Sequence, residues 1–263
     1  MNLSRRVAIF NLHPGKSNLS QSNMTYKPVQ VRNRVLGSAG RRAPTDKELK
    51  RILFWARESR NAERNELIFF MQLIGFRITE TAMVTVDRVM WKSGQWRDEI
   101  LLPAKMCKNN KANHVLFVNK RLRKAGDQYV KIRINKNHRT TGKLDEWRGL
   151  APNSKLILAE GGRPFSLKSK PRVNDAGETV IYWAADSLQE TFSEWCECAG
   201  LKGELSSHCG RKAFSSRLAK NKTTSQEDII ATLLRHNETD SIYNYVEESA
   251  DISNSISKIY ENL

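Results

Sequence analysis

Apolar residues recur at helical spacing near the start of the folded part of the chain. Between residues 49 and 56 they fall at i, i+3, i+4 and i+7, the pattern of one buried helix face. Thr45 and Glu48 precede this run with the spacing of a capping box, in which each side chain satisfies a free backbone donor. We therefore expect an amphipathic helix that begins just after Pro44, followed by a polar connection over 57–64.

The same periodicity predicts further helices along the chain. Residues 67–74 form an apolar face that ends near Gly75, a usual helix-terminating residue, and Arg77 to Glu80 opens a short third helix. Residues 188–199 show another apolar face, which stops at Gly200. Helices are also expected from His208 to residue 218, over 229–234, and in a C-terminal tail helix over 251–263.

The pattern changes to that of strands between Trp91 and Val118. Residues 98–103 and 113–118 are predicted to pair as an antiparallel sheet, joined by a basic hairpin over 104–112. Residues 119–180 are basic and interrupted by Gly and Pro, and loops are expected at 161–164 and 171–177. The predicted fold class is α+β: a mainly helical domain with a small antiparallel sheet.

Charge adds a partner to this picture. The chain has 263 residues and a net charge of +16, which is typical of proteins that bind a polyanion, most often nucleic acid. Residues 1–43 contain eight Lys or Arg and no Asp or Glu, so we interpret them as a flexible basic arm. A domain over 44–250 and a tail over 251–263 complete the predicted organisation.

Neither a membrane anchor nor a metal site is predicted. No apolar run approaches the ~18 residues of a transmembrane helix. The four cysteines lack the spacing of a zinc site or a disulfide framework, so reduced thiols in a cytoplasmic protein are expected.

Candidate chemistry is concentrated between Ser206 and Tyr245. This stretch contains His208, Arg211, His236, Tyr243 and Tyr245, and no acidic residue stands next to the His208/Arg211 pair. A site rich in Arg and His and poor in carboxylate suits a phosphate better than an acyl group or a metal ion.

Several short motifs resemble those of the tyrosine recombinases, the phage integrase family. Gly75 to Glu80 resembles the family's G-x-R-x-x-E box, and His208 to Arg211 its H-x-x-R box. Leu234-Arg-His236, with a tyrosine nine residues later, is similar to its L-G-H…Y ending, although Arg235 replaces the usual Gly. The basic hairpin lies where the family keeps a lysine. The order agrees over roughly three quarters of the chain.

The resemblance implies a phosphate-binding set. Arg77 and Arg211 would clamp the non-bridging oxygens of a phosphodiester, and His236 would hydrogen-bond the scissile phosphate. Glu80 would orient Arg77 or cap its helix. No metal, ATP or other cofactor is implied.

The resemblance also implies a nucleophile and proton carriers. Tyr245, at the family's spacing from His236, would form a covalent 3′-phosphotyrosyl bond, with Tyr243 as a packing residue. His208 would accept or relay the tyrosine proton. Lys108 would protonate the leaving 5′ oxygen; the other hairpin lysines, Lys105 and Lys111, are the alternatives.

The function implied is site-specific recombination of double-stranded DNA, for integration or excision of a mobile element or for inversion. A homo-oligomer assembled on DNA and accessory DNA-binding proteins are expected partners, and the tail would dock on its own core or on a neighbouring protomer. The alternatives are a type IB topoisomerase-like relaxation activity, a non-catalytic DNA-binding regulator and a basic RNA-binding protein. The 43-residue arm is shorter than the DNA-clamping domain that most family members carry.

Overall fold

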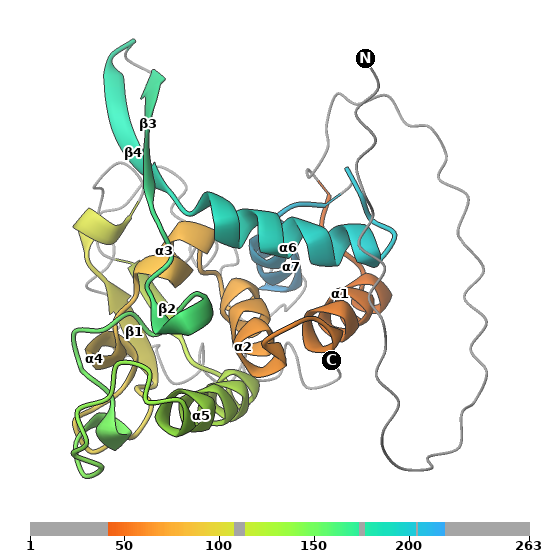
Figure 1. Ribbon diagram of the computed structural model, residues 1–263. Helices are drawn as coiled ribbons and strands as arrows, with labels where there is room; N and C mark the ends of the chain where they lie inside the picture. The colour runs from red at the N-terminus through yellow and green to blue at the C-terminus, as the bar shows by residue number, and fades with distance from the viewer. Residues whose placement is uncertain (1–41, 108–113, 174–176, 204, 219–263) are drawn as a thin grey trace, which may run out of the picture. The chain divides into compact units, whose positions relative to one another are not determined.

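The computed structural model describes residues 42–107, 114–173, 177–203 and 205–218 (Figure 1). Its α-helices are α1 (Asp46–Glu58), α2 (Ala62–Leu73), α3 (Ile78–Met83), α4 (Val86–Val89), α5 (Lys120–Asn135), α6 (Asp186–Cys198) and α7 (Cys209–Leu218). Its strands are β1 (Glu99–Leu102), β2 (His114–Phe117), β3 (Lys168–Val173) and β4 (Thr179–Ala184). The predicted α+β class is confirmed. The predicted elements at 229–234 and 251–263 and the basic arm lie outside the described residues, so the division into arm, domain and tail stays a prediction.

The first helix begins with the predicted capping box. The Thr45 hydroxyl accepts from the Glu48 N–H at 3.3 Å, and Glu48 Oε2 accepts from the Thr45 N–H at 2.8 Å. Arg42 also donates to both oxygens of Glu48, and this pairing lowers the pKa of the Glu48 carboxyl to about 2. The helix continues to Glu58, so the polar connection predicted over 57–64 is reduced to the three residues between α1 and α2.

Helix α2 lies at the centre of the described core. It packs against α1, α3, α5 and α7, and every residue from Leu67 to Leu73 is buried. Because this part of the helix is buried on all sides, its sequence is almost entirely apolar. Because α2 touches so many elements, its C-terminal end can position segments that are distant in the sequence.

The predicted sheet forms with the expected direction. Strands β1 and β2 pair antiparallel, with Ile100 opposite Leu116 and Leu102 opposite His114. Along β1, exposed and buried residues alternate, so one face of this small sheet packs on the core.

Residues 119–180 contain more regular structure than the predicted loops. Helix α5 is capped at its N-terminus by Asn119, whose Oδ1 accepts from the Leu122 N–H at 2.8 Å. On its inner face Arg133 is fully buried and donates to the carbonyls of Leu156 and His138. The helical pattern of this segment is difficult to recognise from the sequence, because a basic residue, Arg133, occupies a position on the buried face.

The loop predicted at 171–177 is also partly wrong. Residues 171–173 belong to β3, which pairs antiparallel with β4 in a two-stranded ribbon (Figure 1). Pro171 stands opposite Ile181 in this ribbon. A two-stranded ribbon consists of edge strands alone, and edges are where a sheet tolerates proline.

None of the described helices has the length and apolar character needed to cross a membrane.

The close approach of α7 to α2 gives a first prediction. A Cβ on Gly210 would lie 2.6 Å from the Gln72 Cβ and 2.8 Å from the Gln72 carbonyl carbon. Gly210→Ala should therefore push α7 away and lower the free energy of unfolding by about 1–3 kcal/mol. Thermal unfolding should show a drop of about 2–4 °C per kcal/mol.

Ser216→Ala, at a half-buried position on the same helix, is the control and should change the midpoint little. Alanine favours a helix over glycine by about 1 kcal/mol. A raised midpoint in Gly210→Ala would therefore contradict the prediction, because it would show that the gain in helix propensity outweighs the steric contact with Gln72.

Candidate active site

A glycine turn at the end of α2 directs the first candidate residues. Gly75 has a φ of +103°, a conformation that side chains rarely adopt, and a Cβ there would meet Leu116 and Phe214 at 3.4 Å. The Gly75 N–H donates to the Gln72 carbonyl at 3.2 Å and the Phe76 N–H to the Met71 carbonyl at 3.1 Å, which closes the helix end. The chain then reverses directly into Arg77.

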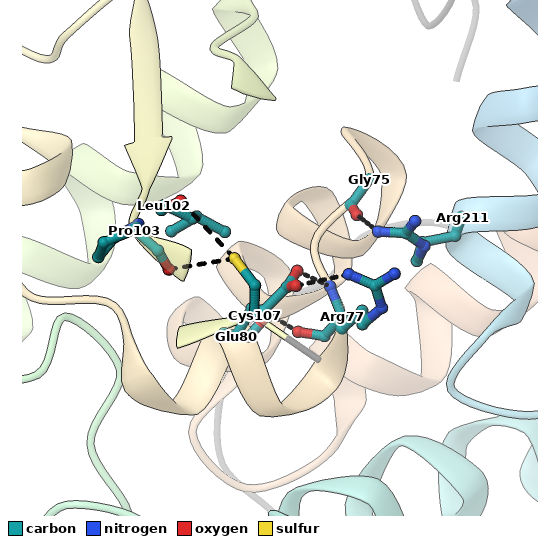
Figure 2. Close-up of polar contacts among 8 residues, drawn as sticks. Gly75, Arg77, Glu80, Leu102, Pro103, Cys107 and Arg211 are labelled. Carbon is teal, nitrogen blue, oxygen red and sulfur yellow. Dashed lines mark hydrogen bonds and ion pairs between the residues drawn. The ribbon is translucent and has the colours of Figure 1, made fainter. Parts of the chain in front are cut away.

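Arg77 and Glu80 form a closed pair at the start of α3 (Figure 2). The Arg77 N–H donates to Glu80 Oε2 at 2.8 Å, and Arg77 Nη1 donates to Glu80 Oε1 at 2.7 Å. Glu80 is 1% exposed and the Arg77 side chain 22% exposed. Glu80 thus both caps α3 and orients the guanidinium, so the two roles expected for it are combined.

Arg211 lies in the first turn of α7 and reaches back to the same turn. Its side chain is buried, and Nη1 donates to the carbonyl oxygen of Gly75, 136 residues earlier in the chain (Figure 2). Gly75 is two residues from Arg77. The structure therefore brings together the two arginines that the sequence predicted as a phosphate clamp.

His208 immediately precedes α7. Its residue is exposed, its N–H donates to Ser206 Oγ at 3.4 Å, and its carbonyl accepts from the Lys212 N–H at 3.1 Å. The neighbouring Cys209 faces the core instead. A hydrogen bond with the Cys196 thiol, together with burial, raises the pKa of the Cys209 thiol, which is consistent with a packing role.

The remaining candidates, Lys108, His236 and Tyr245, lie outside the described residues, as do Lys111 and Tyr243. Lys105 belongs to a 3-10 turn at Ala104–Met106. Cys107, just before Lys108, is buried in the core, and its Sγ donates to the Pro103 carbonyl at 3.2 Å. The residue that precedes Lys108 is therefore anchored in the core. The choice among the hairpin lysines stays a prediction.

Gln72 was not identified from the sequence. It is fully buried near the end of α2, and its amide contacts segments on both sides of the candidate site. The only hint in the sequence is a polar amide within the apolar run 67–74.

The described geometry holds two arginines at one turn of a mainly helical domain. The sequence matches the model of the phage integrase family over residues 44–251, and the chain belongs to that family. Among curated protein sequences, none shows a significant match to this chain.

Two solved structures show the same fold at low sequence identity. The integrase from mycobacterium phage Brujita is 16% identical, with a TM-score of 0.50, over 90% of this chain and 62% of that one. The integrase of the Tn1549 transposon, solved in complex with transposon right end DNA, is 13% identical, with a TM-score of 0.50, over 80% of this chain and 65% of that one. This chain thus spans less than two thirds of the length of both integrases.

The Arg77–Glu80 pair can be tested through protein stability. Removing one partner of a buried pair leaves an uncompensated charge. The losses of unfolding free energy in Arg77→Met and Glu80→Leu should therefore add up to more than the loss in the double variant. We expect a coupling energy of about 1.5 kcal/mol or more from urea denaturation of the four proteins.

The exposed Lys202–Glu197 pair, whose side chains are 75% and 53% exposed, provides the matched control cycle. Its coupling should be below about 0.5 kcal/mol. Equal coupling in the two cycles would contradict an orienting role for Glu80.

Proposed function

We propose that this protein is a site-specific DNA recombinase, which cuts and rejoins double-stranded DNA through a covalent 3′-phosphotyrosyl intermediate. The observation that carries the proposal is the joining of Arg211 to the Gly75 turn, which places it beside Arg77. Membership of the phage integrase family supports the same reaction class.

The chemistry of phosphate transfer explains why two arginines are needed. A phosphodiester is anionic, and its transition state spreads further charge over the non-bridging oxygens. A guanidinium stays protonated and can present paired donors to those oxygens. Among the described residues, Glu80 is the one acceptor that the Arg77 guanidinium contacts, so Nε and Nη2 remain available to a substrate.

The bond changes are assigned to residues as follows. The Tyr245 hydroxyl attacks phosphorus, its proton passes to His208, and the bond between phosphorus and the 5′ oxygen breaks. Lys108 gives a proton to the departing 5′ oxygen, and His236 hydrogen-bonds the phosphate. Attack by a different 5′ hydroxyl reverses the steps and joins new partners, which conserves the bond energy without ATP.

The expected partners follow from this chemistry and from charge. The net charge of +16 favours a polyanion, and the similar Tn1549 integrase was solved with its transposon DNA. Exchange of strands between two sites needs several active sites at once, which supports a homo-oligomer assembled on DNA, with accessory DNA-binding proteins. Integration or excision of a mobile element is the favoured use, ahead of inversion, in the cytoplasm.

The nucleophile can be identified by trapping the intermediate. A nicked suicide DNA substrate that loses its 5′ hydroxyl fragment should give a covalent protein–DNA adduct on a denaturing gel. Tyr245→Phe should abolish the adduct, since phenylalanine has no hydroxyl, and Tyr243→Phe should retain it.

An adduct that persists in both variants would refute the assignment of Tyr245. DNA relaxation without recombinant product would instead indicate a type IB topoisomerase-like activity. Binding of DNA without any adduct would indicate a non-catalytic regulator.

The lysine assignment can be tested with a leaving group that needs no proton. Lys108→Ala should reduce the rate of adduct formation by about 10²-fold or more, because the 5′ alkoxide leaves unprotonated. A 5′-bridging phosphorothiolate releases a thiolate, whose conjugate acid has a pKa near 8.5, and should restore the rate.

Lys105→Ala and Lys111→Ala are the matched controls from the same hairpin. In both variants, the ratio of the cleavage rates for the ordinary and the sulfur substrate should equal that of the wild type. If one of them shows the sulfur rescue and Lys108→Ala does not, the proton donor is that lysine.

A further inference from the structure

Gln72 is a polar residue at a place where the surrounding packing is apolar. It lies in the last turn of α2 with an exposed fraction of 0%, between Met71 and Leu73, which are also buried. A buried primary amide has two donors and two acceptor positions that must find partners within the protein. Its partners therefore show which segments this residue holds together.

The amide orientation that satisfies both the oxygen and the nitrogen joins three segments. Gln72 Nε2 donates to the carbonyl of Ser207 at 3.0 Å and to the carbonyl of Phe76 at 3.2 Å. Its Oε1 accepts from the Thr81 hydroxyl at 2.8 Å, and that hydroxyl is also 3.2 Å from the Arg77 carbonyl. One side chain thus contacts the Gly75–Arg77 turn, α3 and the segment before α7.

The residues it contacts are the immediate neighbours of candidate catalytic residues. Ser207 precedes His208, and Phe76 precedes Arg77. The backbone of Gln72 also faces Gly210, where any side chain would collide with it. The two halves of the phosphate-binding centre therefore meet on this residue as well as at the bond from Arg211 to Gly75.

We propose that Gln72 is a positioning residue for DNA cleavage, which sets the distance between His208 and Arg77 by holding the backbone next to each. This inference rests on the proposed function. Gln72 touches no reacting atom, so its effect is on the geometry in which the tyrosine proton and the phosphate are held. A displacement of about 1 Å in such a geometry can cost about 10²-fold in rate.

Asn65 provides a matched control on the same helix. It is 1% exposed, seven residues before Gln72, and its Nδ2 donates to the carbonyls of Arg60 at 2.9 Å and Ala56 at 3.2 Å. Its amide thus has the same type of partners, but they belong to the end of α1 and the following connection. Loss of either amide removes two hydrogen bonds to backbone carbonyls, so both substitutions should reduce stability.

The experiment compares Gln72→Met with Asn65→Leu in the full chain. Single-turnover formation of the protein–DNA adduct is measured at saturating suicide DNA, below the unfolding midpoint of every variant. Gln72→Met should be slower by about 10- to 100-fold, with the Kd for DNA within about threefold of wild type. Asn65→Leu should cleave within about threefold of wild type despite a similar drop in the unfolding midpoint.

Gln72→Glu gives a second, nearly isosteric test with a pH signature. An ionised carboxylate cannot donate to the Ser207 or Phe76 carbonyl, whereas the protonated acid can donate to one of them. Burial favours the protonated form, so the ratio of variant to wild-type rate should rise as the pH falls. This test remains available if the methionine variant does not fold.

The outcomes separate the two proposals. A wild-type protein that forms no adduct overturns the proposed function and this inference with it. If wild type forms the adduct, a wild-type rate in Gln72→Met, an equal loss in Asn65→Leu, or a rate ratio for Gln72→Glu that does not change with pH would each overturn the positioning role alone.

Discussion

The hydrogen bond from Arg211 to the Gly75 carbonyl is the contact on which the rest of the site depends. It joins α7 to the turn after α2 across 136 residues of sequence. Two glycines permit it: Gly75 adopts a φ of +103°, and Gly210 lets α7 approach the backbone of α2. A side chain at Gly75 would strain the turn, and one at Gly210 would collide with Gln72 and push α7 away from α2.

The two arginines are held by different means. Arg77 is fixed by a buried carboxylate, with two charge-assisted hydrogen bonds to Glu80. Arg211 is held at the turn by a hydrogen bond to the Gly75 carbonyl. Both guanidiniums are thus oriented by hydrogen bonds within the protein.

Helix α2 explains how such a centre can be rigid. Every residue from Leu67 to Leu73 is buried, and the helix packs against α3, which follows Arg77, and against α7, which carries Arg211. Its two buried amides, Asn65 and Gln72, tie down opposite ends of the helix, one at α1 and one at the site. Because protein interiors are closely packed, a displacement at one end of α2 is passed on to the elements packed against it.

The sequence by itself determined the features that depend on near neighbours. The capping box of α1, the turn at Gly75, the Arg77–Glu80 pair and the β1–β2 hairpin all involve residues close in the chain, so spacing and residue type were sufficient. It also indicated the family through ordered motifs. It did not indicate α5, because a buried arginine interrupts its apolar face. Nor did it indicate the β3–β4 ribbon, in which the apolar residues Ile181 and Trp183 are exposed. Only the tertiary structure decided that Arg211 bonds to Gly75 and that Gln72 joins both halves of the site, because these contacts depend on packing between segments that no local pattern relates.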